Sequence, residues 1–394
     1  MSKTRMSKTR MSKRRCLRME SLLHHDIVER ILEKLPVNSL MRFKTVSKQW
    51  KSTMESRYFQ YRVLKQSGGG DPHVLMVSVC THHEPTSTEF SLRTLVLGSS
   101  SSLKIPTPWE KDNTEYVVSS SSCDGLVCIY YPHKSGFVVN PTTRWYRPLP
   151  LCEYQQLMIR LGESYFKLNH PLFKVGFGKD IHVGTYKPVW LYNSSEIGLE
   201  NATTCELFDF STNAWRYVTP ASPYRVLGVG CPDPAFVDGS LHWFTDCQET
   251  KVVSFDLHTE AFQVVCKAPF VYTNPYEIVM CNLNNRLCVS EKKWPNQVIW
   301  YFNSDNKKWD KMFFIDLELI DFWHDVPLYC ALKPLALLDG EKKSKKKKKL
   351  LFYDRELRYK LLTYDPETGL DDVAFSAESI GHPVCYFQSI VSIL

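Results

Sequence analysis

Asp256-Leu-His-Thr-Glu-Ala-Phe262 is the stretch that decides how the larger part of this chain folds. It follows an apolar run, it begins with a side chain that bonds turn backbones, and it ends in an aromatic residue. The same form recurs at Asn140-Pro-Thr-Thr-Arg-Trp-Tyr146, at Asp209-Phe-Ser-Thr-Asn-Ala-Trp215, at Asn303-Ser-Asp-Asn-Lys-Lys-Trp309 and, more weakly, from Asp365. The steps from Asp209 to Asp256 and from Asp256 to Asn303 are both 47 residues, which predicts a structural repeat.

A second short element precedes some of these copies. It occurs as Asp124-Gly-Leu-Val-Cys128, Asp238-Gly-Ser-Leu-His-Trp243 and Asn284-Asn-Arg-Leu-Cys288. The runs between the turn residues are rich in Val, Tyr, Phe and Trp, as strands are. A period near that of kelch or WD-type blades predicts a β-propeller-like body of radially stacked four-stranded sheets, with a β-sandwich as the alternative.

The repeat also predicts where particular side chains lie. Trp215, Phe262 and Trp309 should occupy equivalent, largely buried positions between blades. Asp209 and Asp256 should lie in tight turns at one common end of the sheets, with each carboxylate accepting a backbone N–H.

The segment before the body, from Leu23 to Leu64, has helical rather than strand periodicity. Leu23, Ile27, Ile31 and Leu35 fall at steps of four, an apolar stripe on an otherwise charged segment. The expected helices are residues 25–34, a second capped by Asn38, a third capped by Thr45 or Ser47, and a fourth that holds Phe59. So small a segment buries little surface alone, so we expect a partner chain to complete it.

Identity and spacing across this segment resemble the F-box of plant F-box proteins. The matching residues are Leu23, Asp26-Ile27-Val28, Ile31-Leu32, Leu35-Pro36-Val37, Ser39-Leu40, Phe43, Val46-Ser47-Lys48, Trp50 and Phe59. One departure is His24, which stands where the family usually has proline. The resemblance implies docking onto a Skp-type adaptor and, through it, a cullin. The adaptor-binding residues that it implies are Leu23, Ile27, Ile31, Leu32, Leu35, Pro36, Val37, Leu40, Val46 and Trp50.

Segments of the body resemble the F-box-associated region, type 1 and kelch-like, of the same proteins. They are Ser122-Cys-Asp-Gly-Leu-Val-Cys128, Val139-Asn-Pro-Thr-Thr-Arg-Trp145, Gly176-Phe-Gly-Lys-Asp180, Tyr186-Lys-Pro-Val-Trp190, Gly239-Ser-Leu-His-Trp243 and Ser254-Phe-Asp-Leu257. In the family this region is taken to hold the protein to be ubiquitylated. The resemblance therefore implies the substrate-recognition subunit of a Skp–cullin–F-box ubiquitin ligase, a non-catalytic role that supplies proximity.

The expected organisation is an α+β multidomain chain. Its parts are a basic tail (1–19), the F-box (20–66), a linker (67–72) and a mainly-β F-box-associated domain (73–394) with a lysine-rich loop insertion (341–349). No run is long and apolar enough to cross a bilayer. The chain is therefore expected in the cytoplasm, the nucleus or both.

Charge is unevenly placed along the chain. The net charge is +7, but the first 18 residues hold eight Lys or Arg, and the run 342–349 holds seven Lys. The remaining chain has 34 basic residues against 42 acidic ones, which argues against a phosphate-tracking surface. The candidate basic localisation segment is Lys342, Lys343, Lys345, Lys346, Lys347, Lys348 and Lys349. A nucleic-acid-associated or scaffold protein acting through these segments is the alternative function.

Scattered histidines and cysteines provide no recognisable catalytic or metal site. His182, His242 and His258 fall at strand or turn positions of the repeat, and no nucleophile elbow, phosphate loop or zinc-type spacing occurs. The thirteen cysteines are scattered singly, mostly in apolar runs, as reduced core thiols are. We therefore expect no catalytic residue, no metal and no cofactor.

Overall fold

The computed structural model describes residues 25–66, 71–80, 90–109, 116–161, 173–197, 201–228, 232–271, 274–320, 330–339, 348–354 and 360–393. Contacts divide the chain into two compact units. One unit, here called the head, holds Met1–Gly69 and Ser389–Ser392. The other, here called the body, holds Gly70–Gln388 and Ile393–Leu394.

The described N-terminal part of the head consists mainly of helices. They are α2 (His25–Glu33), α3 (Val37–Phe43), α4 (Lys48–Glu55) and α5 (Arg57–Gln66). The Ser47 hydroxyl caps α4 by accepting the N–H of Gln49 at 3.2 Å, which confirms one of the two expected caps. Asn38 is not a cap, because α3 already begins at Val37 behind Pro36. Pro36 is the N-cap residue, with φ −57° and ψ 147°, and its lack of an N–H removes no hydrogen bond of the helix.

Apolar side chains from all four helices form the core of the head. The cluster holds Val28, Leu32, Val37, Leu40, Met54, Phe59 and Val63, all buried. Ile390, from the C-terminal segment Ser389–Ser392, is 2% exposed and belongs to the same cluster. The head core is therefore built from two parts of the chain that lie more than 300 residues apart in sequence.

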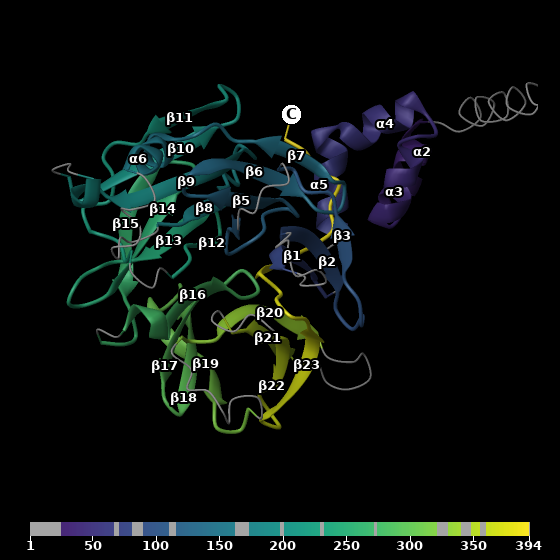
Figure 1. Cartoon of the computed structure of the whole chain (residues 1–394). Coiled ribbons are helices and arrows are strands. Elements are labelled where there is room, and N and C mark those ends of the chain that lie inside the picture. The colour runs from purple at the N-terminus through teal and green to yellow at the C-terminus, as the bar shows by residue number, and fades with distance from the viewer. Residues whose placement is uncertain are drawn as a thin grey trace, which may run out of the picture. The chain divides into compact units, whose positions relative to one another are not determined.

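The described strands of the body form six antiparallel sheets of four strands, arranged as the blades of a propeller (Figure 1). Blades 1 to 3 are β24 (His382–Tyr386) with β1 (His73–Cys80), β2 (Phe90–Val96) and β3 (Leu103–Ile105); β4 (Val117–Val118), β5 (Val127–Tyr131), β6 (Lys134–Asn140) and β7 (Trp145–Pro148); and β8 (Val175–Lys179), β9 (Tyr186–Asn193), β10 (Thr203–Asp209) and β11 (Ala214–Tyr217). Blades 4 to 6 are β12 (Ala235–Val237), β13 (Ser240–Phe244), β14 (Lys251–Asp256) and β15 (Ala261–Lys267); β16 (Ile278–Asn282), β17 (Leu287–Lys293), β18 (Asn296–Asn303) and β19 (Lys308–Asp316); and β20 (Lys333–Asp339), β21 (Lys348–Tyr353), β22 (Lys360–Asp365) and β23 (Leu370–Ser376). The propeller prediction is confirmed over the sandwich.

Apolar clusters between adjacent blades form the core of the body. One cluster joins blades 5 and 6 through side chains such as Ile299 and Phe352, and another joins blades 4 and 5 through Val252 and Met280. Short helices lie between strands: α6 (Glu153–Leu161), η1 (Ser194–Ile197) and η2 (Pro275–Glu277). No described helix is long and apolar enough to span a membrane.

The repeated turns have one geometry. In five blades the connection from the third to the fourth strand begins at Asp or Asn, and the residue four positions later has a left-handed backbone. Those residues are Arg144, Asn213, Glu260, Lys307 and Gly369, with φ between 54° and 71°. Asp256 Oδ1 accepts the N–H groups of His258 at 2.9 Å and Thr259 at 2.7 Å, and Asp209 Oδ1 accepts that of Ser211 at 2.8 Å. The expectation for Asp209 and Asp256 is confirmed.

The second sequence element forms the hairpin between the first and second strands of a blade. Both central residues have positive φ in the pairs Asp124-Gly125, Asp238-Gly239 and Asn284-Asn285. That is the two-residue turn whose twist matches the flanking strands. In an antiparallel blade this hairpin lies at the same end as the connection from the third to the fourth strand, so both kinds of turn share one face of the body. We call it the turn face.

The repeated aromatics are equivalent, and each is more buried than exposed. Trp215 pairs with Phe208 across β10 and β11, and Trp309 pairs with Phe302 across β18 and β19. Each indole N–H donates to the preceding blade, at 2.7 Å to Pro150 O and Lys267 O respectively. Trp215, Phe262 and Trp309 are all only partly buried. They lie on outermost strands, which leaves each ring partly exposed, and the expectation of equivalent, largely buried positions is confirmed.

The propeller ring closes within blade 1, where the last strand pairs with the first. β24 runs antiparallel to β1, from His73 opposite Tyr386 to Val77 opposite His382. Gly381, just before β24, has φ +60°, and a Cβ there would overlap Val77 O and lie 2.8 Å from Ser78 C. Only glycine fits this close approach without strain.

Parts of the lysine-rich segment are ordered strand. Lys348 and Lys349 begin β21 and pair with Asp339 and Leu338 of β20, so they do not belong to the expected loop insertion. Residues 340–347, like the basic tail 1–19, lie outside the described residues. The cysteines whose side chains the structure describes form no disulfide. Burial raises the pKa of the Cys281 thiol to about 12, so this thiol is unreactive near neutral pH.

Because Ile390 fills the head core, its truncation should loosen helices that are distant in sequence. Ile390→Ala should cost about 3 kcal/mol of head stability, as for other buried Ile to Ala changes. Hydrogen exchange of the full chain should show faster exchange in α2 and α5. Phe387→Ala, at an exposed residue three positions earlier, is the control and should leave the head unchanged. Equal exchange in both variants would contradict the role of Ile390.

Candidate functional site

Helix α2 has two apolar faces, of which one lacks a partner among the described residues. Val28 and Leu32, four positions apart, are buried in the head core. Ile27 and Ile31, also four positions apart, are 49% and 50% exposed. Val46, just before α4, is a further exposed aliphatic residue of the head. Paired exposed β-branched side chains on one helix face form a surface suited to another protein's apolar side chains.

The other residues expected to bind the adaptor lie in three kinds of place. Leu32, Val37 and Leu40 are buried in the head core. They present little surface to an adaptor, so their contribution to adaptor binding is to hold the helices in place. Leu35 and Trp50 are half-buried against that core, and Pro36 is exposed. Leu23 lies outside the described residues.

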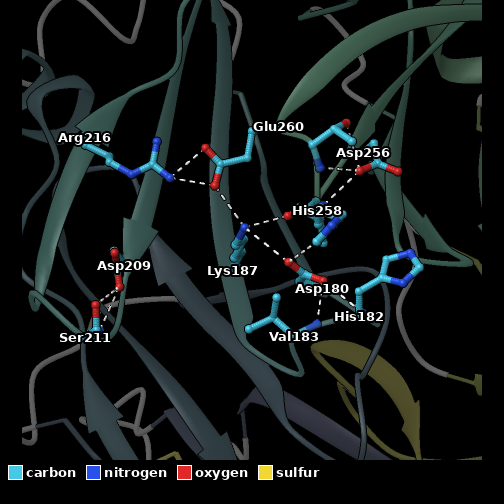
Figure 2. Close-up of polar contacts among 12 residues, drawn as sticks. Asp180, His182, Val183, Lys187, Asp209, Ser211, Arg216, Asp256, His258 and Glu260 are labelled. Carbon is cyan, nitrogen blue, oxygen red and sulfur yellow. Dashed lines mark hydrogen bonds and ion pairs between the residues drawn. The ribbon is translucent and has the colours of Figure 1, made fainter.

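The second candidate region is the turn face of the body, where Asp180 organises a polar network (Figure 2). Asp180 begins the connection from β8 to β9 and is 3% exposed. Its Oδ1 accepts the N–H groups of His182 and Val183, both at 3.0 Å. Gly184, four positions later, has φ +83°, so this loop repeats the Asp turn at another place in the blade.

Charged side chains extend the network from blade 3 to blade 4. Lys187 Nζ lies 2.9 Å from Glu260 Oε1 and 3.8 Å from Asp180 Oδ2, and it donates to Leu257 O at 2.5 Å. Arg216 donates to both carboxylate oxygens of Glu260 at 2.6 Å. Figure 2 shows these groups converging from two blades. Each carboxylate therefore has cations or N–H donors on several sides.

These contacts shift the ionisation of the two carboxyl groups. Burial opposes ionisation of Asp180, but hydrogen bonds from Val183, His258 and His182 and the charge of Lys187 outweigh it. The pKa of Asp180 therefore lies below its ordinary value of 3.8. Burial likewise opposes ionisation of Glu260, and Arg216 and Lys187 outweigh it, so the pKa of Glu260 is also lowered. Both groups are anionic near neutral pH.

Two of the three histidines considered from the sequence lie side by side in the fold. The rings of His182 and His258 are 4.6 Å apart, and His258 Nδ1 is 3.1 Å from Asp180 Oδ2. A carboxylate beside an imidazole resembles part of a catalytic constellation. Here the carboxylate already accepts two backbone N–H groups, so the arrangement fits a turn that joins two blades. Within the described ranges no three His, Cys, Asp or Glu side chains form a metal-binding group.

A second buried carboxylate joins inner parts of three blades. Asp233, before β12, pairs with Lys174, before β8, at 2.7 Å, and with Lys333 of β20. Burial opposes its ionisation, but the two lysines outweigh that effect and hold its pKa well below the ordinary value. Asp124, expected as a turn residue, is one, and it also binds Lys179 at 2.6 Å and the Tyr186 hydroxyl at 2.8 Å. The charged groups thus link neighbouring blades.

Sequence reasoning named His182, His258 and Asp124 singly, but it did not bring the residues of these networks together. Asp180 ended one of the recognised segments, but its partner His258 is 78 residues away. Lys333 and Asp233 are 100 residues apart. No local spacing connects such residues. The sequence signal that was available is Gly184, four positions after Asp180. Its left-handed backbone matches the turn pattern of the repeat.

Comparison with known proteins gives two family matches. Residues 76–393 match a family described as the F-box associated beta propeller domain, and residues 21–61 match the F-box domain. An F-box/LRR-repeat/kelch-repeat protein of Arabidopsis thaliana is 62% identical over 382 residues, covering 96% of this chain and 98% of that protein. Two F-box proteins of the same plant are 48% and 47% identical, each covering 95% of this chain and 86% and 100% of their own lengths. No enzymatic family is indicated.

Removing the charge of Asp180 should weaken the body in a pH-dependent way. Asp180→Asn should cost about 2 kcal/mol of unfolding free energy at pH 7, because several donors lose an anionic acceptor. A carboxyl with a lowered folded pKa stabilises the fold above its unfolded pKa, and this stabilisation is lost as pH falls through the folded value. The difference between wild type and variant should therefore shrink below pH 3.8.

Urea unfolding at pH 7 and at stepwise lower pH measures this difference. Glu318→Gln, at an exposed acidic residue after β19, is the matched control and should change stability little at any pH. An Asp180→Asn variant as stable as the control at pH 7 would contradict the proposed link between blades.

Proposed function

Because the chain belongs to the plant F-box proteins that carry an F-box-associated β-propeller domain, we propose that it is the substrate-recognition subunit of a Skp–cullin–F-box ubiquitin ligase. The head docks the Skp-type adaptor, and the adaptor connects the chain to a cullin. The body holds the protein to be ubiquitylated. The chain needs no catalytic residue of its own, because it raises the local concentration of a substrate lysine near charged ubiquitin.

The observation that carries the proposal is the outward face of α2. Ile27 and Ile31 are apolar, half-exposed and one helical turn apart on a helix whose other face is already buried. A four-helix unit of this size gains stability when a partner covers such a face. Members of the F-box family bind Skp-type adaptors through this segment. A Skp-type adaptor is therefore the partner that we propose for this face.

The turn face supports the substrate-binding half of the proposal. Its backbone is fixed by the repeated turns, whereas the side chains between the Asp and the left-handed residue are exposed in several blades. Exposed residues on a rigid scaffold are where binding specificity is usually placed. We place the protein in the cytoplasm, the nucleus or both, with the lysines between 342 and 349 as a nuclear import signal.

Charge placed on the outward face of α2 should abolish adaptor binding without unfolding the head. Ile27→Asp combined with Ile31→Asp should weaken binding of a recombinant Skp-type adaptor by more than about thirtyfold, as for central apolar anchors of an interface. Isothermal titration calorimetry with the full chain measures the affinity. Circular dichroism checks that the helices remain.

The control for this experiment is Leu103→Asp, the same kind of change at an exposed residue of β3 in the body. It should leave adaptor affinity within about twofold. If the Ile27 and Ile31 double variant binds the adaptor as well as wild type does, the proposed docking surface is wrong. If the wild-type chain binds no Skp-type adaptor at all, the proposed function is wrong.

The basic segments should direct localisation and contribute nothing to adaptor binding. A fluorescent fusion that lacks residues 1–18 and has alanine at the five lysines between 342 and 347 should shift from nucleus to cytoplasm. Lys348 and Lys349 are kept because they pair within β21. Adaptor affinity should be unchanged. Unaltered nuclear signal would exclude an import role, and salt-sensitive binding of this variant to DNA would favour the nucleic-acid alternative.

A further inference from the structure

A pocket of about 550 Å³ opens between blades 4 and 5 at the turn face. One wall comes from blade 4 and includes Ser240, His242, Ser254 and Gln263. The opposite wall comes from blade 5 and includes Arg286, Tyr301, Phe302 and Asp305. Asp238, in the hairpin of blade 4, completes the rim. The volume lies within the range of pockets that hold ligands or one or two residues of a peptide.

The wall from blade 4 has polar side chains at two positions where blade 2 does not, whereas the position of Gln263 is polar in both, as Arg147 in blade 2. His242, Ser254 and Gln263 lie opposite one another on β13, β14 and β15. The corresponding residues of blade 2, on β5 and β6, are Cys128 and Val138. Blade 4 thus has an imidazole and a hydroxyl where blade 2 has a thiol and an aliphatic side chain. The repeat itself does not require polar groups here.

Two of these polar side chains, Ser254 and His242, are buried. Ser254 is 1% exposed, and its hydroxyl makes no hydrogen bond to any residue that the structure describes. His242 Nδ1 lies 3.3 Å from Ala235 O, and burial lowers the pKa of this imidazole to about 4, so it is neutral near pH 7. A hydroxyl that lines an open pocket is available to hydrogen-bond a ligand that enters it.

At the interface between blades 3 and 4, apolar side chains of blade 4 fill the corresponding space. A Cβ at Gly178 would overlap the ring of Phe236 and lie 2.7 Å from Leu257. At Gly176 it would lie 2.9 Å from Leu241. Blade 4 therefore packs its apolar side directly against the backbone of blade 3. Its other side, toward blade 5, keeps an open and polar space near the turn face.

The rim of the pocket is predominantly acidic. Asp238 and Asp305 are exposed, and neither carboxylate has an ion pair within the described ranges. The one cation of the lining, Arg286, lies over the ring of Tyr301 at 4.9 Å. Two unpaired carboxylates beside aromatic rings favour a cation with an apolar stem, because rim charges select partners of opposite sign.

We propose that the pocket between blades 4 and 5 binds a short segment of the protein to be ubiquitylated, with a lysine or arginine side chain as its anchor. Asp238 and Asp305 pair with the cationic group, and the stem lies against Phe302, which faces blade 4. Ser254 and Gln263 bond the peptide groups of the segment. This inference rests on the proposed function and names the chemistry that its substrate site recognises.

Peptide binding to the full chain tests the inference directly. The probes are four pools of fluorescein-labelled nonapeptides that differ only in the central residue, Lys, Arg, Glu or Ala, within neutral randomised flanks. Fluorescence polarisation should show tighter binding of the Lys and Arg pools than of the Glu and Ala pools. Asp238→Asn combined with Asp305→Asn should weaken the Lys and Arg pools about fivefold or more. Asn also tolerates the positive φ of position 238.

A second variant blocks the space without changing charge. Ser254→Leu places an apolar side chain in the pocket and should weaken binding more than about tenfold. Asp372→Asn, at an exposed acid of blade 6 in the position that corresponds to Gln263, is the matched charge control and should have no effect. Thermal unfolding and adaptor affinity of every variant confirm that the fold is intact.

Each outcome decides for or against the inference. Preference for the basic pools that is lost in the pocket variants and retained in Asp372→Asn supports it. No binding, equal binding of all pools, preference for the Glu pool, or equal loss in the Asp372→Asn control overturns it. If adaptor binding is normal while the peptides fail, only the pocket inference falls. Absence of adaptor binding counts against the proposed function, whatever the peptides do.

Discussion

The pairing of β24 with β1 is the constraint on which the rest of the body depends. Every other blade is made from consecutive strands, but blade 1 takes its innermost strand from the far end of the chain. Without that strand, β1 would present an open edge, and the ring of blades would have two free ends. The entropic cost of closing a loop rises only slowly with its length. One well-formed strand pair can therefore offset the cost of closing a loop of some 300 residues. The fit of Gly381 against Ser78 fixes the register of this closure.

Closure also has a consequence for the head. Once β24 has ended at Tyr386, the chain continues to Ser389–Ser392, which belongs to the helical unit and places Ile390 in its core. The chain therefore passes between the two units three times, after Gly69, after Gln388 and after Ser392. The stability of the helical unit is thus coupled to completion of the body, although the helices occupy the start of the sequence.

The sequence predicted the parts of the structure that depend on local patterns. Helical periodicity placed α2, the hydroxyl of Ser47 marked a helix start, and the Asp-based repeat predicted blades and turns. Asn38 failed as a cap because the N-cap is Pro36, two residues earlier. The partial exposure of Trp309 was not predicted, because periodicity does not tell an outermost strand from an inner one. The networks around Asp180 and Asp233 join residues 78 to 100 positions apart, so only the folded chain reveals them.

The central claim is that this chain joins a substrate-binding propeller to an adaptor-binding head. Its most direct test is reconstitution of the full chain with a Skp-type adaptor and a cullin, with the product measured by light scattering after size-exclusion chromatography. We expect one species whose mass equals one copy of each protein. A folded chain that elutes alone, apart from an adaptor–cullin complex, would contradict the claim.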